Sequence, residues 1–123
     1  NFEFRKAEEV MGGLLQAHSD IDAVFCGNDA MAMGAYQAIA AAGRAQEIMI
    51  FGFDGSADVV DMIRKGKIEA TVMQFPGIMA ETAAENADRY IKGERDFQQK
   101  VLVPVELVTQ ENNDQYVGYG RAD

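Results

Sequence analysis

The sequence predicts an α/β fold in which a mainly parallel sheet is flanked by helices, and two observations lead to this prediction. Short apolar segments alternate along the chain with longer segments of helical periodicity, the pattern of repeated strand–helix units. Residues 21–28 and 47–54 are apolar throughout instead of alternating, as expected for strands that are buried on both faces of a sheet. Such alternating units imply parallel strands joined by helical crossovers.

The first half of the chain contains two helices and two strands. Residues 5–18 form a helix, because apolar side chains recur at helical spacing: Ala7, Val10, Met11, Leu14 and Leu15. Residues 21–28 are predicted to form a strand, and residues 29–43 an Ala- and Met-rich helix that Gly43 ends. Residues 47–54 form the second strand, which ends in a carboxylate at Asp54.

The second half continues the alternation. Ser56 is the expected N-cap of a helix, and Pro76 ends a strand because proline has no N–H for a sheet ladder. The expected elements are a helix over 56–66, a strand over 68–75, a helix over 77–93, a strand over 100–109 and one helical turn in the polar tail.

The composition excludes several classes of function. The chain has 123 residues, suited to one domain, and 48% of them are apolar, so it can build a core. The net charge of −9 argues against nucleic acid and anionic lipid, which both need a basic face. A single cysteine, Cys26, and a single histidine, His18, provide neither an intrachain disulfide nor a zinc site. We therefore expect no cofactor and no metal.

The start of the chain and its small number of strands suggest a part of a larger protein. The opening residues "NFEF" have no partner strand before them, and four strands are few for a parallel sheet covered by helices. The first ten residues also lack a basic and then apolar leader.

Three of the predicted strands end in a polar side chain: Asn28, Asp54 and Gln74. Ligands of open α/β sheets bind beyond the carboxyl ends of the strands, so these groups should face one crevice. Together they form a hydrogen-bonding set for hydroxyl groups, such as those of a sugar. Each one alone also fits a structural role, as a helix cap, a turn residue or a strand end.

Asp54 also raises a catalytic alternative. An aspartate nucleophile of the DxD type needs a second acid where this chain has Ser56. A phosphoacceptor receiver domain needs an acidic pair for Mg²⁺ and a later lysine, but Asn28–Asp29 is a poor pair and Gln74 has no lysine beside it. The receiver stays a less favoured alternative.

Aromatic rings add to the sugar interpretation. Sugar sites combine hydrogen-bonding groups with aromatic rings that stack on apolar sugar faces. Phe53 directly precedes Asp54, and Phe2 lies near the start of the chain. Either ring fits a plain core role equally well.

Three segments resemble the periplasmic sugar-binding proteins of ABC transporters, in the ribose-binding-like group with the type I periplasmic binding fold. They are "DIDAVFCGNDAMAMGAYQAIAAAG", "IMIFGFDGSADVVDMIRKGKIEATVMQFP" and "LVTQENNDQY", which contain the motifs N-D-x-M-A-x-G, G-F-D-G and A-T-V-x-Q-x-P in this order. The resemblance covers almost the whole chain. It implies the C-terminal half of a two-lobed protein that closes on a sugar.

The resemblance implies a role for each candidate residue. Asn28 matches the asparagine after the "AVF" strand, and Asp54 matches the aspartate of G-F-D-G, which binds sugar hydroxyls in the family. Phe53 matches the pocket wall, and Gln74 matches a glutamine near a hinge crossover. Phe2 falls where the family stacks an aromatic ring on the sugar.

The resemblance also implies a division of the chain between lobes. Residues 1–74 belong to the C-terminal sugar-binding lobe, and residues 75–105 form a crossover helix and strand that pack with the N-terminal lobe. Residues 106–123 return to the C-terminal lobe. The implied partners are a monosaccharide or polyol, the N-terminal half of the same protein and the ABC permease membrane subunits. The implied compartment is the periplasm, and no catalysis is implied.

The neighbouring alternative is the effector-binding domain of lac-repressor-type regulators, which shares the fold. Those regulators tend to read P-L-T-T-V where this chain reads "GKIEATVMQ". This difference favours the transport protein.

Overall fold

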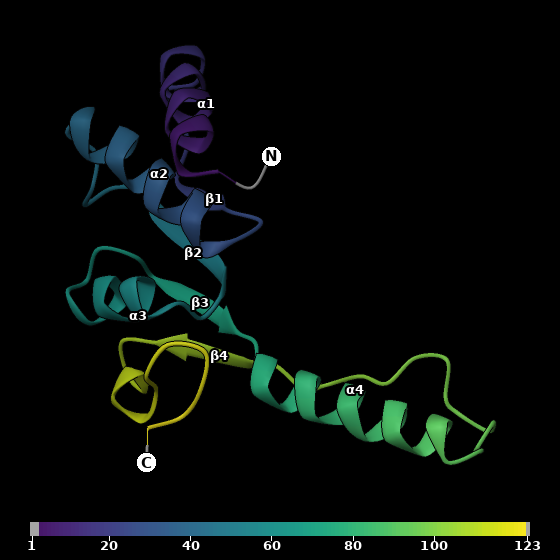
Figure 1. Ribbon diagram of the computed structural model, residues 1–123. Helices are drawn as coiled ribbons and strands as arrows, with labels where there is room; N and C mark the ends of the chain where they lie inside the picture. The colour runs from purple at the N-terminus through teal and green to yellow at the C-terminus, as the bar shows by residue number, and fades with distance from the viewer. Residues whose placement is uncertain (1–2, 123) are drawn as a thin grey trace.

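The computed structural model describes residues 3–122 and has the predicted order of alternating helices and strands (Figure 1). Phe2, a predicted site residue, lies outside the described residues. The elements are α1 (Phe4–Ala17), β1 (Ala23–Phe25), α2 (Asp29–Ala41), β2 (Met49–Asp54), α3 (Ala57–Arg64), β3 (Ala70–Met73), α4 (Pro76–Ile91), β4 (Glu106–Thr109) and the 3₁₀ turn η1 (Asn113–Gln115).

The four strands form one sheet in the order β1-β2-β3-β4. β2 pairs in parallel with both β1 and β3, which confirms the predicted mainly parallel sheet and brings three carboxyl ends to one edge. β4 is antiparallel to β3, with Glu106 opposite Met73. The chain leaves β3 at its carboxyl end and re-enters the sheet at that same end, so β4 has to run in the opposite direction.

The predicted strand over 100–109 is wrong in its first half. Residues 100–105 have no regular structure, and only Glu106–Thr109 joins the sheet. Pro104 cannot donate to a ladder, and no strand of residues 3–122 pairs with this segment. The strand predicted over 21–28 is likewise reduced to Ala23–Phe25.

The core lies between the sheet and the helices α2 and α3. Its largest fully buried apolar side chains come from both layers: Ile39, Ile50, Ile63, Met73, Val59 and Val108. Asn28 and Ser56 cap α2 and α3, since each side-chain oxygen accepts a hydrogen bond from the backbone N–H three residues later. These caps place the starts of both helices next to the carboxyl ends of β1 and β2.

The opposite face of the sheet is open, which corrects the expectation that β1 and β2 are buried on both faces. Phe25 is 67% exposed, and Met49 and Leu107 are about half exposed. Among the helices, α2 makes most of the contacts of β2, on the face that carries Gly52. The apolar composition of these strands therefore exceeds what the described helices cover.

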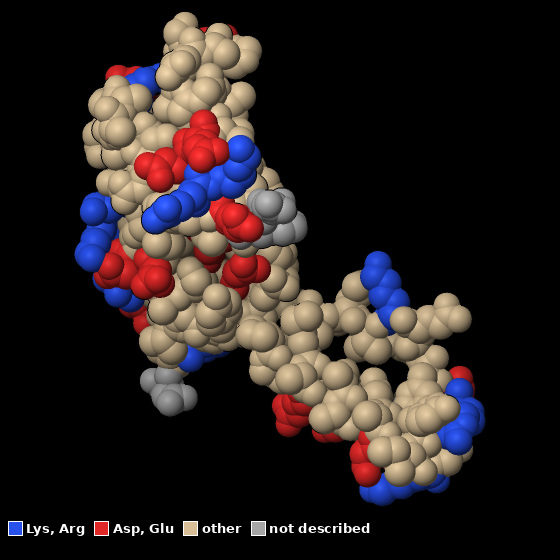
Figure 2. All heavy atoms as spheres, turned by 45° about the horizontal axis from the view of Figure 1, so that its top comes forward, with Lys and Arg blue, Asp and Glu red and all other residues tan. Residues whose placement is uncertain are grey.

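Helix α4 differs from the other three helices because none of its residues is buried. Figure 1 shows it extending away from the sheet, with the irregular segment that follows it running back toward β4. In Figure 2 the arm formed by α4 and the irregular segment after it stands clear of the rest of the molecule, with charged side chains of both signs at its far end. No helix in residues 3–122 combines the length and apolar character needed to cross a membrane.

Candidate functional site

Asp54 and Gln74 meet at the carboxyl edge of the parallel strands. Asp54 is the last residue of β2, and Gln74 directly follows β3. The Gln74 side-chain Nε2 donates to the Asp54 Oδ1 at 2.7 Å, and the Gln74 backbone N–H donates to the Asp54 carbonyl at 3.0 Å. The Asp54 Oδ2 has no hydrogen-bond partner within residues 3–122. One carboxylate oxygen is thus held by the protein while the other can accept from a ligand hydroxyl.

The backbone at Asp54 is strained. Its φ of 127° lies in the region that favours glycine, and the next residue, Gly55, has a φ of 81°. Three hydrogen bonds hold this turn: Gln74 N–H donates to the Asp54 carbonyl, Tyr119 N–H donates to the Gly55 carbonyl at 2.7 Å, and Ser56 N–H donates to Asp29 Oδ2 at 2.6 Å. The turn therefore fixes the direction in which the Asp54 carboxylate leaves the strand.

Asn28 is half-buried and follows β1 at the same edge. Its Oδ1 accepts a hydrogen bond from the Met31 N–H at 2.9 Å, so the capping role considered from the sequence is confirmed. Its Nδ2 group makes no hydrogen bond to any residue in the described part of the chain. Asn28 thus caps α2 and still presents two amide donors.

Phe53 precedes Asp54 at the carboxyl end of β2. Phe53 is half-buried and lies opposite Val72 in the register of β2 and β3. The pocket-wall role of Phe53 stays a prediction.

Sequence reasoning missed the importance of Asp29, which it treated only as half of a poor acidic pair. Asp29 is 2% exposed, and its Oδ1 accepts a hydrogen bond from the Thr71 hydroxyl at 2.6 Å. Burial raises the pKa of Asp29, and the hydrogen bonds from Thr71 and Ser56 oppose that rise. The sequence feature that could have indicated this role is the position of Asp29 directly after Asn28, in the first turn of a helix that follows a strand.

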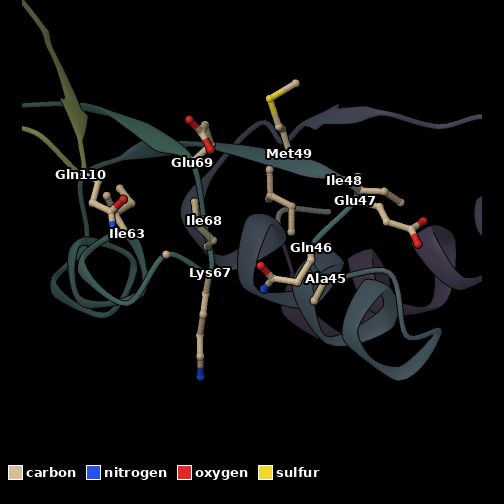
Figure 3. Close-up of a pocket in the computed structure, with 12 residues that line it drawn as sticks. Ala45, Gln46, Glu47, Ile48, Met49, Ile63, Lys67, Ile68, Glu69 and Gln110 are labelled. Carbon is tan, nitrogen blue, oxygen red and sulfur yellow. The ribbon is translucent and has the colours of Figure 1, made fainter.

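A separate hollow of about 200 Å³ lies at the other end of the sheet, beside the first residues of β2 and β3. The Lys67 ammonium and the Glu47 and Glu69 carboxylates extend in three different directions there (Figure 3). No set of polar groups converges in this hollow, unlike at the carboxyl edge. Among residues 3–122, no three His, Cys, Asp or Glu side chains are grouped to hold a metal ion.

Comparison with known families decides which proteins this chain is related to. Residues 4–95 match the family described as "Periplasmic binding protein domain", which is more than half of the chain. The chain belongs to the periplasmic binding protein family. This membership confirms the resemblance inferred from the N-D-x-M-A-x-G, G-F-D-G and A-T-V-x-Q-x-P motifs.

Two relatives of this periplasmic binding protein chain are named as sugar import proteins. The D-apiose import binding protein of Paraburkholderia graminis is 42% identical over 113 residues, which are 91% of this chain and 36% of that protein. The ribose import binding protein of Salmonella typhimurium is 42% identical over 108 residues, which are 88% of this chain and 36% of that protein. The chain spans just over a third of the length of these curated relatives.

A solved structure gives the same result for the fold. It is an ABC transporter periplasmic solute binding protein from Actinobacillus succinogenes with bound D-allose, and it is 29% identical. The TM-score is 0.89, and the match covers 94% of this chain and 40% of that one. The α/β architecture of this chain is therefore that of a periplasmic binding protein.

Proposed function

We propose that this chain is part of the sugar-binding component of an ABC importer and that it binds a monosaccharide or polyol between two lobes. The observation that carries the proposal is the Gln74–Asp54 pair at the carboxyl edge of the sheet, whose second carboxylate oxygen has no partner among the described residues. The import proteins and the D-allose complex among its relatives support a sugar as the ligand.

Each polar group has a defined task in this proposal. The Asp54 carboxylate accepts a hydrogen bond from a sugar hydroxyl, and the Gln74 amide holds that carboxylate in place. The Asn28 Nδ2 group donates to a hydroxyl oxygen while its Oδ1 caps α2. Phe53 and Phe2 supply apolar surface for the sugar ring. No covalent bond of the ligand is made or broken, so the proposed role is binding without catalysis.

Hinge closure is the binding mechanism that we propose for the two-lobed protein. We assign residues 1–74 to one lobe, residues 75–105 to a crossover that packs on the second lobe, and residues 106–123 to the return. Two connecting segments lie around a hollow of about 220 Å³ near Gln74: residues 74–75 and residues 101–105. A ligand that contacts both lobes binds the closed state better and shifts the population toward it.

The exposed apolar side chains of the arm support the second lobe as its partner. Ile91 is 82% exposed and Leu102 is 76% exposed, and several others are about half exposed: Ile78, Met79, Tyr90, Val101 and Val105. A soluble surface seldom carries such a set without a partner. We propose that the N-terminal half of the same protein covers it, and that this chain alone self-associates and binds sugar weakly.

The remaining partners follow from the proposed transport role. They are the ABC permease membrane subunits, and the proposed compartment is the periplasm, as the family name indicates. The related import proteins favour this role over the effector domain of a lac-repressor-type regulator.

A thermal-shift screen of the protein with both lobes tests the proposal. The panel contains D-ribose, D-apiose, D-allose and myo-inositol, with sulfate and an amino acid as ligands of other classes. A sugar at 100 times its Kd should add about 2.7 kcal/mol to the free energy of unfolding and raise the Tm measurably. A response to no sugar or polyol, or a response only to a ligand of another class, would overturn the proposed function.

A further inference from the structure

Asp29 is the only aspartate or glutamate among residues 3–122 that is buried, and it joins three segments of the carboxyl edge. It is the first residue of α2, directly after Asn28. Its Oδ2 accepts from the Ser56 N–H at 2.6 Å, and its Oδ1 accepts from the Thr71 hydroxyl at 2.6 Å. One carboxylate therefore connects the β1–α2 junction, the turn after β2 and strand β3.

These three segments are the ones that carry the candidate ligand-binding groups. Ser56 lies two residues after Asp54, and Thr71 lies three residues before Gln74. Asp54 keeps an unfavourable φ of 127°, a conformation that persists only where surrounding contacts hold it. The Ser56 N–H bond to Asp29 is the contact that ties this turn to the first turn of α2.

The strand next to Asp29 is shaped to admit its carboxylate. A Cβ atom at Gly52 would lie 2.4 Å from the Asp29 Oδ1, closer than side-chain carbons approach an oxygen. The absence of a side chain at Gly52 thus leaves the space in which Asp29 reaches Thr71. With 2% of its surface exposed, Asp29 itself is out of reach of a ligand.

We propose that Asp29 is a positioning residue of the sugar site, which acts through the Asp54–Ser56 turn and sets the direction of the Asp54 carboxylate. The inference rests on the proposed function and adds to it a residue that touches no sugar. An uncharged amide at this position keeps both bonds, since Oδ1 accepts from Ser56 N–H while Nδ2 donates to the Thr71 hydroxyl oxygen. A methyl group keeps neither.

A double-mutant cycle in the protein with both lobes tests this role. Calorimetry measures the affinity for the panel sugar that binds most tightly, at a temperature where every variant is folded. Asp29→Ala should weaken binding at least about tenfold, and Asp29→Asn should stay within about threefold. In an Asp54→Asn background, chosen so that residual binding is measurable, Asp29→Ala should cause less than about a threefold further loss.

Controls separate positioning from general destabilisation. Asn113 is also buried, at 6% exposure, and bonds to Arg64 and Gln110 away from the carboxyl edge. Asn113→Ala should lower the Tm and leave sugar affinity unchanged. If Asp29→Ala does not fold, Thr71→Val removes one of the two bonds and should still weaken binding by a measurable factor.

The outcomes distinguish this inference from the proposed function. Unchanged affinity in Asp54→Asn, or binding of no panel sugar by the parent protein, overturns the proposed function and the positioning role with it. Weaker binding in Asp54→Asn together with unchanged affinity in Asp29→Ala, or equal losses in both backgrounds, overturns the positioning role alone.

Discussion

Replacing Gly52 by alanine tests the packing beneath the candidate site. The added Cβ would lie 2.4 Å from the Asp29 Oδ1 and 3.4 Å from both the Ala32 Cβ and the Thr71 Oγ1. Contacts of this kind are not found below 3.0 Å, so the carboxylate has to retreat by at least about 0.6 Å. Its bonds to Thr71 and Ser56 leave it no direction in which to move freely.

The magnitude follows from what the carboxylate gives up. A hydrogen bond to a charged group contributes about 1.5–3 kcal/mol, and overpacking a core costs about 1–3 kcal/mol. Alanine recovers about 0.5–1 kcal/mol because glycine loses more backbone entropy on folding. We therefore expect Gly52→Ala to lower the free energy of unfolding by about 1.5–5.5 kcal/mol.

Urea unfolding of the chain, followed by circular dichroism at one low protein concentration for every variant, measures this change, because self-association makes the midpoint depend on concentration. With an m-value of about 2 kcal/mol/M, the midpoint should fall by about 1–3 M. Gly12→Ala is the matched control, because Gly12 lies within α1 and its Cβ would meet no atom within 4 Å. That substitution should stabilise the chain by up to about 1 kcal/mol.

Two results would refute the reasoning. One is a Gly52→Ala variant as stable as the parent protein. The other is a loss of the same size in an Asp29→Ala background, where the smaller side chain leaves room for the new methyl group. Either result would show that Gly52 does not serve to make room for the Asp29 carboxylate.

Three further predictions concern titratable groups. Burial raises the pKa of Asp29, so the native state keeps a proton that the unfolded chain releases, and the free energy of unfolding falls as pH rises from the ordinary value of 3.8 through the native pKa. Asp29→Asn should remove this fall in the urea midpoints, and an unchanged slope of midpoint against pH would contradict the prediction. Burial raises the pKa of the Cys26 thiol to about 11, so a disulfide reagent at about pH 8 should label this thiol only after unfolding. Fast labelling of Cys26 in the native chain would contradict its burial. Hydrogen bonds from Arg121 and, to a smaller extent, from Tyr116 lower the pKa of Glu106, so this group stabilises the fold above the ordinary glutamate pKa and loses that effect as pH falls through the native pKa. Arg121→Ala should raise the pKa of Glu106 in an NMR titration, and an unchanged pKa would show that the ion pair does not form in solution.

Local signals in the sequence predicted the elements and part of the site. Caps at Asn28 and Ser56 and continuous apolar runs are properties of neighbouring residues, and they predicted the element order and the parallel strands. The meeting of Asp54 and Gln74 followed from one topological rule, since carboxyl ends of parallel strands share an edge.

Features that depend on distant partners could not be predicted in this way. Asp29 bonds to residues 27 and 42 positions away, and nothing within its own helix indicates either partner. The length of β4 depends on which strand is available beside residues 100–105. The exposure of Phe25 depends on what covers the open face of the sheet, which its apolar strand does not specify.

Calorimetric titration of Asp54→Ala with the panel sugar that binds most tightly tests the central claim, that Asp54 binds a sugar hydroxyl. In the protein with both lobes, affinity should fall by about 2 kcal/mol or more, roughly 30-fold, because a hydrogen bond to a charged group is lost. Asp58→Ala, which removes an exposed carboxylate from the first turn of α3, should leave affinity unchanged. An Asp54→Ala variant that binds sugar as tightly as the parent protein would contradict the account.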